Sequence, residues 1–244
     1  MKRSASAGLL ALVTSLALGG CAHRPSYEPA DPLEPVNRQI FAFNNTVDRY
    51  VAEPVARGYV KVVPAPVRSG IGNFLDNLGY PVVIVNDLLQ LKLWQATRDT
   101  GRFLFNTTVG LAGILDPATD IGLHANNEDF GQTLGHWGVG EGWFLMLPFL
   151  GPSTNRDLVG SVADGFATPV YYLEGPYQEE TRVGLIVIGA VDTRAGLLGT
   201  EKLMADQLDP YVFLRSAYLD RRYNLLHDGN PPVEEINYDE YFDE

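Results

Sequence analysis

The chain has 244 residues, of which 18 are basic and 30 acidic, giving a formal net charge of −12 at pH 7. A chain this acidic lacks the basic surface that nucleic-acid binding requires, and its charge opposes adsorption to anionic lipid headgroups. Hydrophobic residues make up 45% of the sequence and aromatic residues 11%, a content typical of folded proteins, which excludes a largely disordered chain.

The first 20 residues predict a secretory signal peptide. Lys2 and Arg3 precede an uncharged stretch with an apolar centre at 9–18, and two glycines follow that centre. A basic start, a short apolar region and small residues before a cleavage site mark such a peptide. The alternative is an uncleaved membrane anchor, because about 20 uncharged residues could just span a bilayer. Serines, a threonine and helix-weakening glycines make the stretch a poor anchor.

Cys21 is the single cysteine of the sequence and directly follows this segment. The order Leu-Gly-Gly-Cys at 18–21 resembles the bacterial lipobox. That resemblance implies cleavage before Cys21, a diacylglycerol thioether on its sulfur, and acylation of the new amine, with palmitate as the implied acyl group. Buried acyl chains contribute about 0.8 kcal/mol per methylene, so the anchor would be durable. We expect a signal peptide over 1–20 and a tether over 21–30, and Ala22 favours the outer membrane.

The folded part of the chain is predicted to be mostly α-helical. Asp31 as N-cap and Pro32 at the first helical position predict a helix that ends near Val51, before Pro54. A short helix is expected over 67–79. The apolar stretch at 81–94 fits helix or strand by periodicity, and its continuation to Thr108 favours helix.

The second half of the chain continues this pattern. Residues 119–130 read as a loop, and an Asp-Pro start predicts a helix over 209–226 with Tyr211, Leu214, Tyr218 and Leu225 along one face. Residues 31–228 would form one helical domain, and the acidic tail at 229–244 is expected to be disordered. No uncharged stretch after the signal peptide exceeds 14 residues (142–155), so we expect no membrane-spanning helix.

A glycine-rich segment over 130–157 differs from the rest of the chain. Five glycines fall between 131 and 142, and the uncharged run from Trp143 to Leu150 follows them. Glycine gives the backbone access to positive φ, which suits a bent or mobile hairpin. The segment is therefore either a core strand with glycine turns or a mobile loop that lies near lipid acyl chains.

Catalytic motifs are absent from the sequence. It contains no His-Glu-x-x-His zinc pattern, no Gly-x-Ser-x-Gly nucleophile and no phosphate-binding Gly-x-x-x-x-Gly-Lys loop. Only His124 and His136 lie within the predicted fold. We expect no enzymatic activity, no metal and no cofactor. An anchored chain with apolar stretches too short to span a membrane instead indicates a protein that acts on lipids without catalysing a reaction.

A series of short motifs, weak singly, becomes specific through its order along residues 31–225. They are Asp31-Pro32-Leu33-Glu34 with Asn37-Arg38, Arg102-Phe103 with Asn106-Thr107, Gly110, Gly113 and Asp116, Phe130-Gly131 with Thr133-Leu134-Gly135, Gly138-Val139-Gly140, Leu147-Pro148 with Gly151, Arg156-Asp157, Ala163-Asp164-Gly165, Thr193-Arg194 and Asp209-Pro210-Tyr211. Together with the lipobox, they resemble the MlaA (VacJ) lipoproteins of Gram-negative outer membranes.

This resemblance implies a ring-shaped, amphipathic helical domain embedded in the inner leaflet of the outer membrane. Phospholipids misplaced in the outer leaflet would pass through a polar channel in the ring to a periplasmic carrier, which maintains lipid asymmetry. Trimeric porins are the implied membrane partners. The alternatives are an anchored scaffold that organises porins or envelope partners without a lipid path, and a lipid hydrolase with His136 as the first residue to test.

The resemblance also suggests candidate residues for the channel. Gly138, Gly140 and Gly142 would belong to a hairpin loop that limits access, with Trp143 beside it. Arg102, Arg156 and Asp164 are candidates for the lumen, although a buried salt bridge would explain these charges nearly as well.

Overall fold

The structure is a computed structural model that describes residues 31–232. The predicted signal peptide, the tether, the anchor at Cys21 and tail residues 233–244 lie outside this part of the chain.

The prediction of a mostly helical fold is confirmed. The helices and strands are α2 (Glu34–Val47), the π-helix η1 (Asp48–Ala52), α3 (Glu53–Val62), α4 (Ala65–Leu89), α5 (Leu93–Thr108), α6 (Pro117–Asp120), α7 (Phe130–His136), β1 (Phe144–Leu147), β2 (Gly151–Thr154), α8 (Asn155–Ala167), the 3-10 helix η2 (Pro169–Tyr172), α9 (Gln178–Gly196), α10 (Glu201–Ala205) and α11 (Pro210–Leu226). Within residues 31–232, no helix is both long and apolar enough to cross a bilayer.

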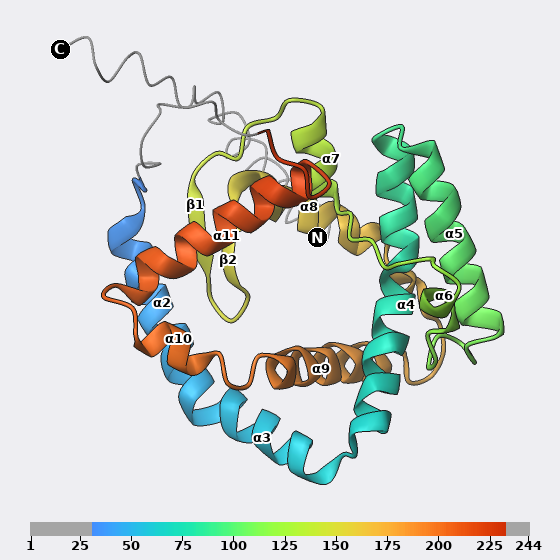
Figure 1. Cartoon of the computed structure of the whole chain (residues 1–244). Helices are drawn as coiled ribbons and strands as arrows, with labels where there is room; N and C mark the ends of the chain where they lie inside the picture. Colours follow the sequence, from blue (N-terminus) through green and yellow to red (C-terminus); the bar gives the residue numbers. More distant parts are fainter. Residues whose placement is uncertain (1–30, 233–244) are drawn as a thin grey trace, which may run out of the picture.

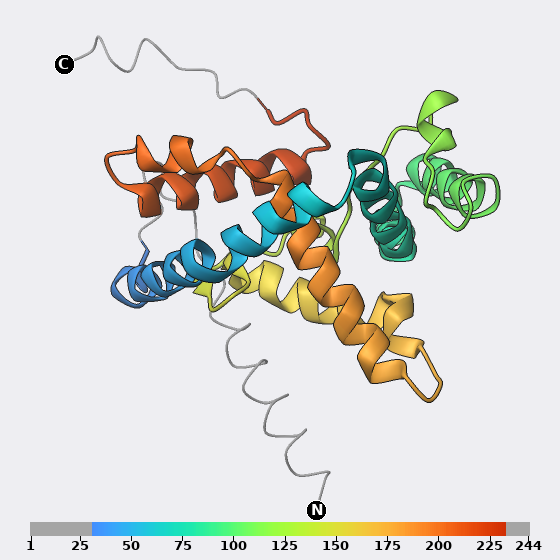
Figure 2. The same cartoon turned by 90° about the horizontal axis from the view of Figure 1, so that it is seen from below.

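The elements follow one another around a ring (Figure 1). The contacts run from α2 through η1 and α3 to α9 and α4, then through α7 and α11 to the β-hairpin, which packs back on α2. The hairpin of α4 and α5 lies on one side of this circuit, and Figure 2 shows that the corner between η2 and α9 projects from one face. The ring arrangement agrees with the sequence-based expectation.

The first helix differs from its prediction at both ends. It begins at Glu34 with Leu33 as N-cap, because the Asp31 carboxylate accepts from the Leu33 and Asn37 nitrogens instead of capping the helix. It also continues past Val51, since η1 leads directly into α3. The wider π turn, closed by the Glu53 amide donating to the Asp48 carbonyl, allows Pro54 to enter in the first turn of α3.

The prediction for residues 67–108 is also wrong in its boundaries. The helix α4 covers the first expected helix and the first part of the second, and it passes through Pro81. The chain then reverses at Leu91, which has a φ of 61°, and the Lys92 amide donates to the Asp87 carbonyl. This reversal uses no glycine or proline, so no local signal marks the start of α5.

The segment at 144–154 forms an antiparallel β-hairpin in which Phe144 pairs with Thr154 and Leu147 with Gly151. Phe144 and Met146 are buried, as a core strand requires. Gly138, Gly140 and Gly142 are not part of this hairpin and lie in the loop between α7 and β1. We call residues 138–142 the glycine loop. The prediction that these glycines belong to a loop that limits access to a channel stays a prediction.

A small apolar core lies where the hairpin meets α2 and α11. Phe144, Met146 and Tyr211 form its buried centre, and half-buried side chains of α2 and α11 pack around them. The Asp209 carboxylate caps α11 by accepting from the Tyr211 and Val212 amides, which confirms the predicted Asp-Pro helix start.

Asn37 fixes the hairpin to α2, and we expect its loss to be costly. Its amide donates to the Phe144 carbonyl at 3.0 Å and accepts from the Met146 amide at 2.9 Å, with 2% of the residue exposed. Asn37→Ala leaves these buried groups without partners, so the free energy of unfolding should fall by about 2 kcal/mol. Urea titration in a neutral detergent measures this, and the exposed Asn45→Ala on the same helix should change it little. Equal effects of the two variants would contradict the assignment.

Candidate functional site

The described part of the chain has an unusual distribution of polarity. Seventeen polar or charged residues are buried, against eight apolar ones, and four of those eight are alanines. Large apolar side chains are instead exposed on almost every helix, among them Val62, Trp94, Ile186 and Leu203. A protein surrounded by water arranges its residues in the opposite way. The exterior of the ring is thus suited to an apolar environment, and its interior is held by polar contacts.

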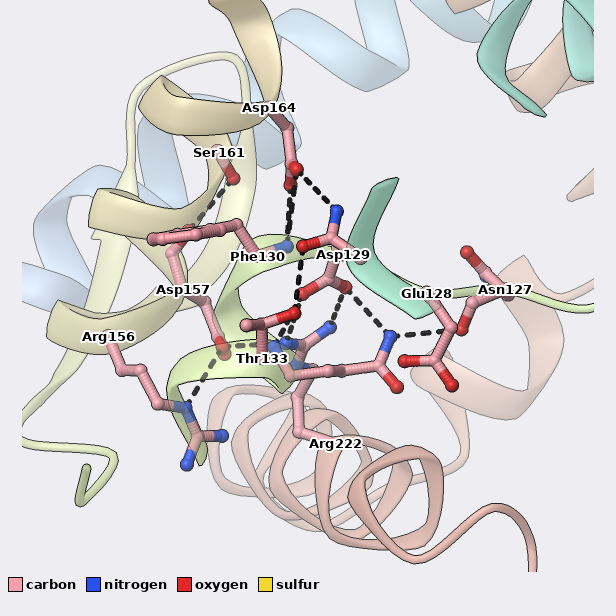
Figure 3. A network of polar contacts seen from close by, with 12 residues as sticks. Asn127, Glu128, Asp129, Phe130, Thr133, Arg156, Asp157, Ser161, Asp164 and Arg222 are labelled. Carbon is pink, nitrogen blue, oxygen red and sulfur yellow. Dashed lines mark hydrogen bonds and ion pairs between the residues drawn. The ribbon is translucent and has the colours of Figure 1, made fainter. Parts of the chain in front are cut away.

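The strongest polar network joins α7, α8 and α11 (Figure 3). The Arg222 guanidinium donates to both Asp129 oxygens at 2.5 and 2.9 Å and to Asp157 at 2.7 Å. The Tyr218 hydroxyl donates to the other Asp157 oxygen at 2.7 Å. Asp129 also caps α7 by accepting from the Gln132 amide. One arginine therefore holds three helices together at the interior of the ring.

The acids of this network titrate differently because their partners differ. Burial raises the pKa of Asp129, but the hydrogen bonds and charge of Arg222 outweigh it, so the pKa lies below the usual value. Burial also raises the pKa of Asp164 and there prevails over the hydrogen bonds from the Phe130 and Asn86 nitrogens. Asp164 is therefore held by hydrogen bonds and not, among the ion pairs of residues 31–232, by the buried salt bridge that was the alternative, and its place in a lumen stays a prediction.

Arg102 lies in a different cluster from Arg156 and Asp164. It donates to Asp116 at 2.7 Å, to the Thr119 hydroxyl at 2.8 Å and to the Leu123 carbonyl at 2.5 Å. Asn106 adds a hydrogen bond to Asp116. These contacts fasten α6 and the loop after it to α5. The structure therefore separates Arg102 from the other two charged candidates and gives it the contacts of a buried salt bridge.

Two carboxyl groups, Asp87 on α4 and Asp99 on α5, face one another in the interior of this hairpin. Both residues are at least 98% buried, and no donor reaches either Asp87 oxygen. Burial and the neighbouring Asp99 raise the pKa of Asp87 to about 8. We therefore expect Asp87 to keep its proton at neutral pH, because ionisation there would add a second buried charge beside Asp99.

The Asp87 proton predicts a pH dependence of stability. The pKa is raised on folding, so this contribution is complete below about pH 4 and is lost as the pH rises towards 8, by at most about 1.4 kcal/mol per pH unit. Asp87→Asn should flatten this fall between pH 5 and 8, as followed by urea titration at several pH values. Asp220→Asn, at an exposed position, is the control. An unchanged slope in Asp87→Asn would show that the pair does not hold the proton.

The glycine loop is attached to the start of α8. The Arg156 amide donates to the Glu141 carbonyl and the Asn155 amide to the Trp143 carbonyl, both at 3.2 Å. Gly138 and Gly140 are exposed, whereas a Cβ at Gly142 would lie 2.8 Å from the Asn155 Cβ. Trp143 is 46% exposed. The structure thus brings Arg156 and the predicted loop residues together.

No catalytic arrangement is visible in residues 31–232. His124 and His136 are exposed, and the His136 ring lies against Trp137 rather than against an acid. No group of three or more potential metal ligands is found within these residues. An apolar cavity of about 380 Å³ lies between α4, η2 and α9, with Leu75, Leu78 and Ile186 in its lining and Arg182 at its edge.

Sequence reasoning missed Arg222 and Asp129, which lie at the centre of the interior network. Tyr211, Arg215, Tyr218 and Arg222 recur at helical spacing, and all four face the interior. The predicted stripe contained Leu214 and Leu225 in place of the two arginines. The helical spacing of the arginines with Tyr211 and Tyr218 was the available signal, because a buried arginine needs acidic partners.

The chain is similar in sequence to a family of known proteins. The family model of the MlaA lipoprotein matches residues 29–225. The chain is 38% identical over 242 residues to the intermembrane phospholipid transport system lipoprotein MlaA of Escherichia coli K12, which covers 94% of both chains. It is 36% identical over 232 residues to the protein of the same name from Haemophilus influenzae, covering 91% of this chain and 90% of the other.

A solved structure gives the same result. It comes from work on the structural basis for maintenance of bacterial outer membrane lipid asymmetry, and it superposes with a TM-score of 0.73 and 37% identity over 81% of this chain and the whole of the other. An uncharacterised protein of Rickettsia typhi is 34% identical over 202 residues. The family model, the curated relatives and the solved structure all point to the same family, and the chain belongs to the MlaA lipoprotein family.

Proposed function

We propose that this protein removes misplaced phospholipids from the outer leaflet of the outer membrane, lets them pass through the polar interior of the ring, and delivers them to a periplasmic carrier. It is anchored through lipid on Cys21, lies on the periplasmic side of the membrane and is not an enzyme. Its relatives are named for intermembrane phospholipid transport, which supports this role.

The observation that carries the proposal is the inverted distribution of polarity. A phospholipid headgroup crosses hydrocarbon slowly, because burying its charge without partners is costly. A ring with apolar side chains outside and polar groups inside lowers that cost for the headgroup while the acyl chains stay in lipid. With no spanning helix in residues 31–232, the ring would rest in one leaflet.

The exposed apolar exterior also fits a protein partner, and this supports trimeric porins as neighbours in the membrane. The same feature would suit a scaffold that binds porins without conducting lipid. The two functions differ in their need for an open interior, so the test must close the interior without removing the protein.

A disulfide across the end of the hairpin ladder would hold the glycine loop on α8. Trp143 and Asn155 continue the register of Phe144 and Thr154 by one position, and opposite Cβ atoms in such a ladder lie about 4.5–5.5 Å apart, close to disulfide geometry. Cells with Trp143→Cys and Asn155→Cys should accumulate outer-leaflet phospholipid as cells lacking the protein do. A reductant should restore asymmetry.

Each single-cysteine variant is the matched control, because it changes the same side chains without a crosslink. Cys21→Ala should abolish function through mislocalisation, as detected by membrane fractionation. If the crosslinked protein maintains asymmetry like the wild type, lipid does not pass this loop and the scaffold is favoured. His136→Ala should have no effect, and loss of function there would point to hydrolysis.

A further inference from the structure

Arg156 is buried and poor in hydrogen bonds. Only 5% of the residue is exposed. Its Nη1 donates to the Val139 carbonyl at 3.3 Å, its Nε lies 3.5 Å from Asp157, and its Nη2 has no partner in the described part of the chain. Arg222, in contrast, makes three bonds of 2.5–2.9 Å. A buried guanidinium with unused donors requires an explanation, because such groups are almost always satisfied.

The guanidinium lies between Asp157 and the glycine loop, because its Nε faces Asp157 at 3.5 Å and its Nη1 donates to the Val139 carbonyl. Figure 3 shows it joined to Asp157 on the side of that carboxylate that is away from Asp129 and Asp164. On that side lie the Val139 carbonyl of the glycine loop and Gly135, whose Cβ would be 2.9 Å from Nη1. The guanidinium therefore faces the loop and the end of α7.

The glycine loop and the residue after it, Trp143, place three carbonyl oxygens on this part of α8. Val139 accepts from the Arg156 side chain, Glu141 from the Arg156 amide, and Trp143 from the Asn155 amide. All three bonds are 3.2–3.3 Å long, at the weak end of the normal range. The first turn of a helix favours negative charge because its amides lack intrahelical acceptors. Neutral carbonyls thus occupy a position that suits an anion better.

Two glycines, one at each end of the loop, would allow it to leave this position. Gly138 has a φ of +86° with nothing near its Cβ position, and Gly142 has a φ of +72°. Both are backbone conformations that glycine adopts without strain. Rotation at these two positions would lift the carbonyls from α8 without disturbing the hairpin that follows.

We propose that the Arg156 guanidinium and the first-turn amides of α8 form a binding site for the phosphodiester group of a phospholipid, which the glycine loop covers in the conformation described here. This inference rests on the function proposed above and names a recognition residue for its substrate. Arginine binds phosphate oxygens through charge-assisted hydrogen bonds, and Nη2 is the donor that has no partner here.

The neighbouring acids do not block this site. Asp157 balances the charge of Arg156, but its two oxygens already accept from Arg222 and Tyr218 at 2.7 Å. Asp129 is bound by Arg222 and the α7 amide. Glu141 belongs to the loop and would move away with it. The arginine thus keeps its donors available while its charge is compensated, which favours a ligand that is bound and released over one that is held permanently.

Phosphorus NMR on the purified full chain in dodecyl maltoside would test the proposal. Short-chain dihexanoylphosphatidylglycerol is the first probe and inorganic phosphate the second. Arg156→Gln should weaken binding of the lipid at least tenfold, and Arg156→Lys should retain part of it, because the charge remains without the paired donors. Arg98→Gln, on the exposed face of α5, should bind like the wild type.

Movement of the loop can be tested in the same assay. Gly142→Ala should push the loop from Asn155 and tighten lipid binding, whereas the oxidised Trp143→Cys, Asn155→Cys protein should bind only after reduction. Thermal unfolding of each variant verifies that it is folded.

Unchanged lipid affinity in a folded Arg156→Gln protein would overturn the inference. Equal affinity for inorganic phosphate and for the lipid would overturn the assignment of a phospholipid. Neither result depends on the cellular test, where normal outer-leaflet phospholipid in cells lacking the protein would instead refute the proposed function.

Discussion

Replacing Gly160 with alanine is expected to disrupt the crossing of α7 and α8. A Cβ at this position would lie 2.7 Å from the Gly131 Cα and closer still to the Gly131 nitrogen. These are backbone atoms within the interior network, so they cannot move aside as a flexible side chain would. The helices must separate, and with them Asp129 and Asp157 move away from their shared Arg222. We expect Gly160→Ala to lower the free energy of unfolding by about 3 kcal/mol.

Gly165 supplies a matched control on the same helix. No atom lies within 4 Å of the Cβ position there, so Gly165→Ala should stabilise the protein by up to about 1 kcal/mol through helix propensity. Urea titration of both variants in a neutral detergent measures the difference. If Gly160→Ala is as stable as Gly165→Ala, the close approach of α7 and α8 is not required for the fold.

Replacing Arg222 with methionine is expected to cost about 3–5 kcal/mol, because two buried carboxylates lose their main partner. Methionine keeps a side chain of similar length, so the loss of charge and hydrogen bonds dominates the effect. Asp129 loses the two Arg222 bonds and the positive charge that do most to hold its pKa low, so its pKa should rise. The destabilisation should therefore be smaller in acid, where Asp129 takes up a proton.

The neighbouring Arg221→Met tests whether the effect is specific, since Arg221 is exposed and should change stability by less than about 0.5 kcal/mol. Adding Asp129→Asn to Arg222→Met should recover part of the loss by removing one uncompensated charge. Equal costs for Arg221→Met and Arg222→Met would show that the network does not hold α7, α8 and α11 together.

Local signals explain which elements could be predicted. The Asp-Pro pair at 209–210 predicted the start of α11, and the Asp209 side chain caps that helix. The same pair at 31–32 misled, because Asp31 bonds to Asn37 and Tyr211, which are brought to it by the fold. The break at Leu91 carries no local signal and is imposed by the packing of α5 on α4.

The residues of the candidate site likewise differ in whether the sequence alone could identify their contacts. Arg156 and the glycine loop are close in the sequence, and their proximity could be anticipated from the motifs that contain them. Arg222 and Asp129 are 93 positions apart, and Arg222 and Asp157 are 65 apart. With 30 acidic residues in the chain, no pattern in one sequence identifies which of them pair with this arginine.

The sequence by itself determined the helical class, the family resemblance and the absence of a catalytic motif, because each depends on residues near one another or in a fixed order. Only the tertiary structure decided that polar groups fill the interior and apolar groups the exterior, and that Arg156 keeps free donors beneath the glycine loop. Both facts depend on which faces of distant helices meet when the ring closes, and burial is a property of that closure rather than of any single helix.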